Sequence, residues 1–125
     1  SLKNDLIRHV FGDQWFQLKS IIDECPDMVR MPLNDRGDTA LHLAAREGSL
    51  EIVKELVKRM RPEDMLIPNS DGMLPLHLAA ASYGDNQSLN NRSIVDILSS
   101  RQVIDKMDYK DIERLFFMTI RIHMF

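Results

Sequence analysis

The stretch NDRGDTALHLAA, residues 34–45, returns as NSDGMLPLHLAA, residues 69–80. His42 and His77 are 35 positions apart, and Gly37 and Gly72 are separated by the same distance. A unit of about this length that joins a turn, a short apolar helix and a second helix is typical of stacked repeat proteins. The pattern therefore predicts a stack of helix pairs. Such an architecture builds a binding surface, and nothing in it builds a catalytic centre.

The first copy predicts a helix pair with definite ends. Thr39 is placed to cap a helix over residues 40–47, and Gly48 ends it because glycine enters the left-handed region easily. Leu43, and Leu76 in the second copy, are expected in the core. A second helix follows from about Ser49, and its apolar residues recur at helical spacing. They are Leu50, Val53, Leu56 and Val57, with Glu51, Lys54, Glu55 and Lys58 facing outward.

A weaker copy precedes these two. When the sequence is shifted by 35 residues, three apolar residues near the start coincide with the stripe of the second helix. They are Leu18, Ile21 and Ile22, and Leu6 coincides with Leu41. Ile7 replaces the histidine and Asp13 replaces the closing glycine, so this copy keeps the packing pattern and loses the signature. Terminal repeats are commonly atypical.

The last copy contains an insertion. Ile94, Val95 and Leu98 match the second-helix stripe only after seven extra residues, which lie within the polar stretch SYGDNQSLNNRS. Such residues add nothing to a core. We expect them in an exposed loop between the paired helices, or in a short extension of the first helix.

The end of the chain predicts one more helix, with Asp108 as its cap. Its apolar residues lie on nearly all sides: Ile112, Leu115, Phe116, Phe117, Met118, Ile120, Ile122, Met124 and Phe125, with Thr119 and His123 among them. A helix of this kind needs burial or a partner. The sequence thus favours self-association through this helix, or a C-terminus that departs from a regular helix pair.

The repeated G-x-[TL]-[AP]-L-H-L-A-A resembles the ankyrin repeat. The resemblance is specific over residues 34–60, good over 65–101 apart from the insertion, and weak over 2–23. It implies an all-α solenoid of stacked antiparallel helix pairs with projecting turns, called fingers, and a divergent C-terminal helix. We expect a single domain over 1–125. Its repeats would span about 1–33, 34–68 and 69–103, with the insertion near 82–92 and the last helix at about 109–125.

The resemblance also implies a function, since ankyrin repeats usually bind another protein through a concave face of fingers and first helices. The variable surface positions of the family fall on Asp35, Arg36, Asp38, Arg46 and Glu47 in one repeat, and on Ser70, Asp71, Met73, Ala81 and Ser82 in the next, with Tyr83 close by. The first copy keeps the family's threonine as Thr39, but the second has Leu74 in its place. The second copy therefore lacks a hydroxyl that would cap the helix and bond the histidine, and we expect it to be softer.

The same residues support a catalytic or metal-binding site less well than a structural role. Zinc bridged by His42 and His77 would need further Cys or His ligands, and Cys25 belongs to another part of the repeat. We expect the histidines to bond turn backbone in their own and adjacent repeats. Cys25 lacks a base and an orienting group. The carboxylates Asp23, Glu24, Asp27, Glu63 and Asp64 are expected at solvated helix starts. We predict no enzyme, no cofactor and no metal site.

Composition and charge exclude further classes of protein. The 125 residues are 44% hydrophobic and 28% charged, which is ordinary for a globular chain. A net charge of −3 leaves no basic footprint for nucleic acid. A single cysteine forms no internal disulfide, and no apolar run is long enough to span a membrane. We expect an intracellular protein, more readily cytoplasmic than nuclear.

A second reading of the function stays open. The chain does not begin with methionine, and we expect it to be a piece of something longer. It could then be the regulatory or targeting segment of a larger enzyme or membrane channel whose active part lies elsewhere.

Overall fold

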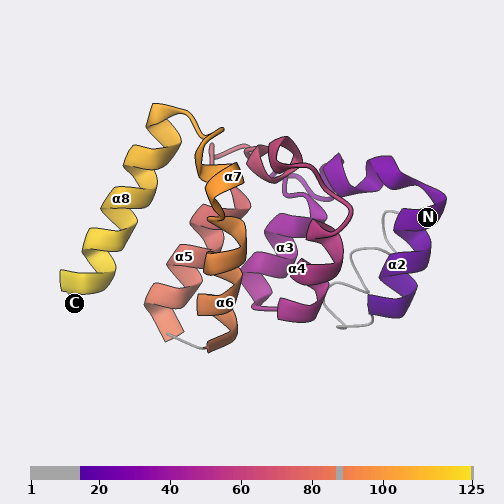
Figure 1. The fold of residues 1–125 in the computed structure, drawn as a ribbon, viewed down its shortest axis with the longest axis horizontal. Coiled ribbons are helices and arrows are strands. Elements are labelled where there is room, and N and C mark those ends of the chain that lie inside the picture. The colour runs from indigo at the N-terminus through magenta and orange to yellow at the C-terminus, as the bar shows by residue number, and fades with distance from the viewer. Residues whose placement is uncertain (1–14, 87–88, 125) are drawn as a thin grey trace.

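The structure, a computed structural model, describes residues 15–86 and 89–124, and the surroundings of side chains for 20–84 and 89–118 within them. These residues form helices and turns and no β-strand (Figure 1). The helices are α2 (Trp15–Glu24), α3 (Ala40–Glu47), α4 (Leu50–Val57), α5 (Pro75–Asn86), α6 (Leu89–Leu98), α7 (Arg101–Ile104) and α8 (Tyr109–Met124), with the 3₁₀ helices η1 (Pro26–Arg30) and η2 (Pro62–Leu66). No described helix has the length and apolar character needed to cross a membrane.

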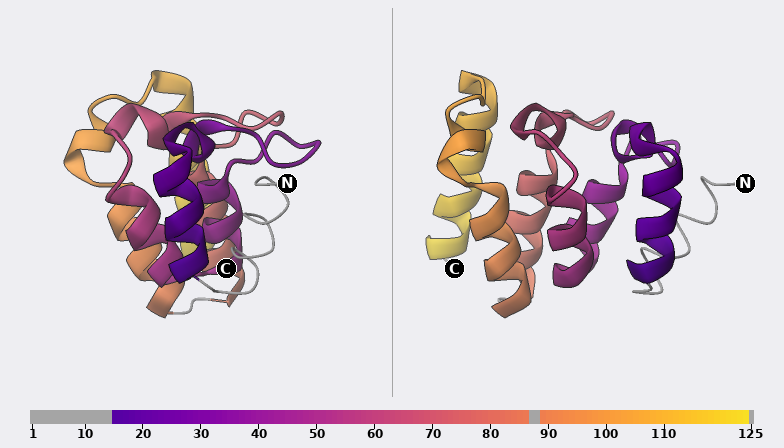
Figure 2. Two further views of the ribbon diagram at one scale, coloured as in Figure 1. Left: turned by 90° about the vertical axis from the view of Figure 1, so that its right-hand side faces the viewer. Right: turned by 45° about the vertical axis from the view of Figure 1, so that its right-hand side comes forward.

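The helices stack in two rows. The pairs α3–α4 and α5–α6 are antiparallel hairpins, and each pair packs against the next. One row, the inner row, consists of α3, α5 and α8, and the other, the outer row, of α2, α4 and α6. Two loops, finger 1 (residues 33–38) and finger 2 (residues 69–73), project from the stack on the side away from α6 and α7 (Figure 2). This is the all-α solenoid that the repeat predicts.

The predicted ends of the first helix are confirmed. Thr39 occupies the N-cap position of α3 in an extended conformation, with φ −83° and ψ 175°. Gly48 closes the helix in the left-handed region, with φ 73°. The N–H of Ser49 then donates to the carbonyl of Ala44, which satisfies a backbone group at the helix end. Local sequence therefore sets the length of α3.

The core lies between the two rows and runs through the stack as one cluster. Leu43 and Leu76 are buried, as predicted, and so are the small residues that let helices approach closely. Fully or nearly fully buried members include Leu41, Ala44, Ala45, Ile52, Leu56, Leu74, Ala79, Ile94 and Leu98. Ile21 and Ile22 of α2 are buried too. Leu6, Ile7 and Asp13 lie outside the described residues, and so does the side chain of Leu18.

The charged side of α4 forms ion pairs between residues three positions apart. Lys54 Nζ lies 3.8 Å from Glu51 Oε1, and Lys58 Nζ lies 3.3 Å from Glu55 Oε1. Such pairs on an exposed helix face add little stability, typically about 0.2–0.5 kcal/mol each. They mark this face as solvated.

The insertion lengthens helices rather than forming a long loop. Helix α5 continues to Asn86 and α6 begins at Leu89, so the second of the two expected arrangements is found. The extension also contacts the preceding repeat. Asn91 is buried, and its Oδ1 would lie only 2.6 Å from a Cβ added to Gly48. The extra residues therefore cover the α3–α4 turn.

The C-terminal part departs from the order finger, helix, helix. Helix α7 packs against η2, and residues 105–108 then connect α7 to α8 without a third finger. Asp108 caps α8 as predicted, because its Oδ1 accepts from the N–H of Asp111 at 2.9 Å. Helix α8 packs on α5 at the end of the inner row. Side chains of residues 119–125, including Ile120, Ile122, Met124 and Phe125, lie outside the described set.

Candidate functional site

Each finger is folded by its first asparagine. Asn34 Oδ1 accepts from the backbone N–H of Arg36 and of Asp38, both at 3.0 Å. Asn69 Oδ1 accepts from Asp71 and Met73 in the same way, also at 3.0 Å. Because these bonds satisfy the turn backbone from inside, the side chains at the tips are left pointing outward. Two loops of the same design thus lie side by side.

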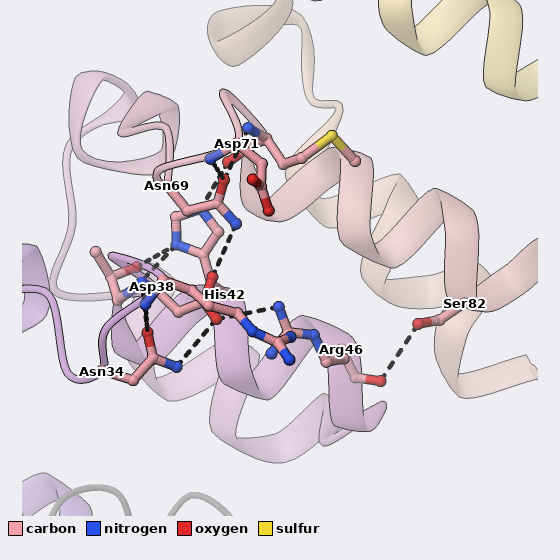
Figure 3. Close-up of polar contacts among 10 residues, drawn as sticks. Asn34, Asp38, His42, Arg46, Asn69, Asp71 and Ser82 are labelled. Atoms are coloured by element: carbon pink, nitrogen blue, oxygen red, sulfur yellow. Dashed lines mark hydrogen bonds and ion pairs between the residues drawn. The ribbon is translucent and has the colours of Figure 1, made fainter.

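Asp38 joins the two fingers from within (Figure 3). Its side chain is fully buried. Asn69 Nδ2 of finger 2 donates to Asp38 Oδ1 at 2.9 Å, Asn34 Nδ2 donates to Oδ2 at 3.1 Å, and Arg46 Nη2 of α3 lies 3.1 Å from the same Oδ2. The prediction that Asp38 lies on the surface is therefore wrong. Its place in a polar turn indicates an exposed residue, but Arg46 of α3 and Asn69 of finger 2 cover its side chain.

The network holds Asp38 ionised. Burial would raise the pKa of this carboxyl, but the hydrogen bonds from Asn69 and Asn34 and the charge of Arg46 outweigh burial, so the pKa lies below its usual value. A buried carboxylate that accepts several hydrogen bonds is stabilised in its charged form. Asp38 is thus a fixed negative charge that positions both fingers.

Two further bonds hold finger 2 to the preceding repeat. The N–H of Ser70 donates to the carbonyl of Arg36 at 2.7 Å, near the tips. At the base, His42 Nδ1 accepts from the N–H of Thr39 at 3.0 Å, so the proton lies on Nε2, which donates to the carbonyl of Met73 at 2.8 Å. Thr39 Oγ1 lies 2.9 Å from the same Nδ1. The histidine bonds turn backbone in its own and the adjacent repeat, as predicted.

The second histidine repeats part of this arrangement. His77 Nδ1 accepts from the N–H of Leu74 at 2.9 Å, and Nε2 donates to the carbonyl of Asp111 in α8 at 3.0 Å. Leu74 supplies no hydroxyl in place of the one from Thr39. Helix α8 also reaches finger 2, since Arg114 Nη1 donates to the carbonyl of Asp71 and to Met73 Sδ, both at 3.1 Å. No pattern in the sequence predicts this contact of Arg114.

The other predicted binding residues lie where a partner can reach them. Asp35, Arg36, Glu47, Ser70, Asp71 and Ala81 are exposed, and Arg46, Met73, Ser82 and Tyr83 are half-buried. Ser82 Oγ donates to the carbonyl of Arg46 at 3.3 Å (Figure 3). The fingers and the C-terminal ends of α3 and α5 therefore carry these residues, and Arg46 also serves the internal network.

The described residues contain no group of three or more His, Cys, Asp or Glu side chains that could hold a metal ion. Of the carboxylates expected at helix starts, Asp27 lies in the first turn of η1 and pairs with Arg30, and Glu63 and Asp64 lie in the first turn of η2. Asp23 and Glu24 instead end α2, where Asp23 Oδ1 lies 3.3 Å from Arg59 Nε. Burial lowers the pKa of both His42 and His77, which keeps them neutral and in their backbone contacts. Cys25 is half-buried and packs against the core.

The repeat pattern extends beyond the two clear copies. A family model for ankyrin repeats, in three copies, matches residues 14–109, most of the chain. The chain belongs to the ankyrin-repeat family. Ankyrin repeats generally are protein–protein interaction modules.

Curated relatives with ankyrin repeats match parts of the chain. The ankyrin repeat-containing protein ITN1 of Arabidopsis thaliana is 46% identical over 48 residues, 38% of this chain and 8% of that protein. Protein phosphatase 1 regulatory subunit 12A of Mus musculus is 38% identical over 71 residues, 57% of this chain and 6% of its own length. The Notch-regulated ankyrin repeat-containing protein of Xenopus tropicalis is 45% identical over 53 residues, 42% of this chain and 43% of that protein. The chain thus covers less than half the length of each of these proteins.

Proposed function

We propose that this chain binds a partner protein through its binding face, defined as the tips of fingers 1 and 2 and the exposed C-terminal ends of α3 and α5. The observation that carries the proposal is the pairing of an internally fixed scaffold with exposed tips. Asp38 joins the two fingers from inside, and His42 of α3 holds finger 2, while Asp35, Arg36 and Asp71 remain exposed.

Such a surface suits recognition because it is already ordered. A loop that must fold on binding loses conformational entropy, and a preorganised loop avoids much of that cost. Exposed charges of both signs occur on the binding face: Asp35, Glu47 and Asp71 are acidic, and Arg36 is basic. We therefore propose that charge complementarity selects the partner and its orientation.

A charge-exchange variant tests the proposal. Asp35→Lys with Arg36→Glu exchanges two exposed charges at the tip of finger 1 and leaves the net charge unchanged. The matched control, Glu51→Lys with Lys54→Glu, exchanges an exposed ion pair on α4 of the outer row. Affinity capture from cell extract with wild type, variant and control is compared by mass spectrometry.

The proposal predicts proteins that bind wild type and the α4 control but are lost with the finger variant. Proteins that bind the finger variant unchanged and are lost with the α4 control would contradict it. Circular dichroism spectra and melting curves of all three chains verify that the fold is intact, which the exposure of the four residues leads us to expect.

A second candidate is a regulatory or targeting segment of a longer protein. It is favoured by the short span over which the chain matches its relatives, one of which is named as a regulatory subunit of a protein phosphatase. An intracellular, mainly cytoplasmic location fits both candidates. The sequence that flanks the chain in its gene separates them, because the second candidate requires a catalytic or channel domain there.

A further inference from the structure

We propose that Arg114 of α8 takes the place of a third finger and so positions finger 2 for binding, a role that rests on the proposed function. Within the described residues, 105–108 connect α7 to α8 without forming a finger that could pair with finger 2. The guanidinium of Arg114 reaches finger 2 instead. Its Nη1 donates to the carbonyl of Asp71 and to Met73 Sδ, both at 3.1 Å, and these two bonds are called the clamp below.

The first bond of the clamp falls on the carbonyl position that joins finger 1 to finger 2. Arg36 and Asp71 are equivalent residues, 35 positions apart. The carbonyl of Arg36 accepts from the backbone N–H of Ser70, which belongs to the next finger, at 2.7 Å. The carbonyl of Asp71 accepts from Arg114. The guanidinium therefore gives finger 2 the kind of donor that the next finger gives to finger 1.

The second bond of the clamp falls on the residue equivalent to Asp38. That residue is Met73, so finger 2 lacks the buried carboxylate through which finger 1 is joined to its neighbour. Met73 Sδ accepts from Arg114 at the same position. Because a thioether sulfur is a weak acceptor, the bond to the carbonyl of Asp71 is the stronger part of the clamp.

The two finger glycines show the same replacement. A Cβ added to Gly37 would lie 3.0 Å from Ser70 Oγ, so the next finger is the near neighbour of this turn. A Cβ added to Gly72 would lie 3.4 Å from Arg114 Nη1. Three successive positions of finger 2 thus lie against Arg114, whereas the equivalent three positions of finger 1 lie against the next finger.

The clamp holds the backbone of finger 2 and leaves its tip accessible. Arg114 binds the carbonyl of Asp71, while the side chain of Asp71 stays exposed. Without the clamp, finger 2 keeps its bonds to the preceding repeat and loses those to α8. A loop held on both sides loses less conformational entropy when a partner binds. Arg114 therefore acts on recognition through the order of finger 2.

Residue-resolved hydrogen exchange of the free chain tests the clamp without a partner. Arg114→Met removes the donor and keeps an unbranched side chain, Arg114→Lys keeps a donor, and Lys110→Met removes an exposed cation one turn earlier in α8. Arg114→Met should speed amide exchange of residues 71–73 by about two- to fivefold, the lower part of the range for one hydrogen bond because Arg114 is exposed. Arg114→Lys should restore much of the protection, and Lys110→Met should leave it unchanged.

The distribution of the change separates positioning from a general loss of stability. A less stable fold would speed exchange in finger 1 and α4 as well, whereas loss of the clamp should be confined to finger 2. Wild-type exchange of residues 71–73 in Arg114→Met overturns the inference. So does a rise that finger 1 and α4 share equally, or an equal rise in Lys110→Met.

A captured partner adds a readout of binding. Arg114→Met should weaken the affinity for a protein that the finger variant Asp35→Lys/Arg36→Glu loses, by about two- to fivefold, with Arg114→Lys close to wild type. Unchanged affinity despite faster exchange in finger 2 would overturn the role of Arg114 in recognition. Failure to capture any partner would count against the proposed function, while the exchange result still decides whether Arg114 holds finger 2.

Discussion

His42 Nε2 donates to the backbone carbonyl of Met73, 31 positions later, at 2.8 Å. This bond ties the first helix of one repeat to the finger of the next. Its geometry requires a neutral imidazole, because Nδ1 must accept from the N–H of Thr39 at the same time. Protonation of Nδ1 would set two N–H groups against each other. The coupling between repeats therefore depends on pH.

We predict that acid weakens the fold through the buried histidines. Burial lowers the pKa of His42 and His77 below the ordinary value of 6.5. Below pH 6.5 these histidines bind protons in the unfolded chain but not in the folded chain. The free energy of unfolding is therefore highest above about pH 6.5 and falls as the pH decreases from there towards the folded pKa. The loss should approach about 1.4 kcal/mol per pH unit for each histidine.

Urea unfolding of wild type and His42→Gln at pH 7, 6 and 5 measures this effect. Glutamine has a donor and an acceptor for the same two backbone groups but does not titrate. The variant should lose less free energy of unfolding than wild type between pH 7 and pH 5. Equal losses in the two chains would mean that His42 contributes nothing to the pH dependence.

The buried carboxylate gives a second prediction. Asp38→Ala removes the acceptor of Asn34 and Asn69 and the ion partner of Arg46. Loss of one member of a buried ion pair usually costs about 3–5 kcal/mol, and we expect about 3 because Arg46 is partly exposed and can be hydrated. Asp35→Ala, on the exposed tip, should stay within about 0.5 kcal/mol of wild type. Chemical denaturation measures the free energy of unfolding of the two variants. Similar values would mean that Asp38 does not stabilise the fold.

The two finger glycines form a matched pair. Gly37 and Gly72 both have positive φ, 76° and 75°, so alanine costs roughly 1–2 kcal/mol of backbone strain at either position. A Cβ on Gly37 would also lie 3.0 Å from Ser70 Oγ and 3.2 Å from its backbone nitrogen, whereas on Gly72 it meets only the flexible end of Arg114 at 3.4 Å.

Gly37→Ala should therefore destabilise the chain by roughly 1 kcal/mol more than Gly72→Ala, the low end of the usual cost of overpacking. Thermal melts of the two variants under identical conditions give the difference. If Gly72→Ala destabilises the chain more than Gly37→Ala, the close approach of finger 2 does not explain the need for glycine at position 37.

Truncation of a core leucine tests the assignment of the repeat core. Leu76 and Leu43 are each 2% exposed, and Leu76→Ala or Leu43→Ala should cost about 2–5 kcal/mol. Phe116→Ala removes a larger side chain, but one that is 60% exposed, and should change stability by no more than about 0.5 kcal/mol in the monomer. Melting curves at low concentration compare them. An unchanged melting temperature for Leu76→Ala would mean that α5 does not contribute to the core.

Local and periodic features of the fold could be predicted from the sequence. Thr39 and Gly48 bound α3 because capping acts within a few residues, and the buried positions follow from helical spacing repeated at a constant offset. The Nδ1 contacts of His42 and His77 also follow, since their backbone partners at Thr39 and Leu74 lie three positions earlier in the same motif.

Long-range polar contacts could not be predicted in this way. Asp38 lies in a polar turn, so nothing nearby reveals that Asn69 and Arg46 bury it from 31 and 8 positions away. Arg114 reaches finger 2 from 43 residues downstream of Asp71, where the repeat pattern has already faded. Such contacts depend on how the helices stack, and composition and spacing do not encode that directly.

The central claim is that the binding face recognises a partner, and hydrogen exchange measures it most directly. With a partner obtained by affinity capture, amide exchange of residues 34–38 and 69–73 is compared in the free and bound chain. We predict slower exchange in both fingers on binding, with α6 and α8 unchanged. Protection confined to residues 83–91, with the fingers unaffected, would contradict the account and move the site to the insertion.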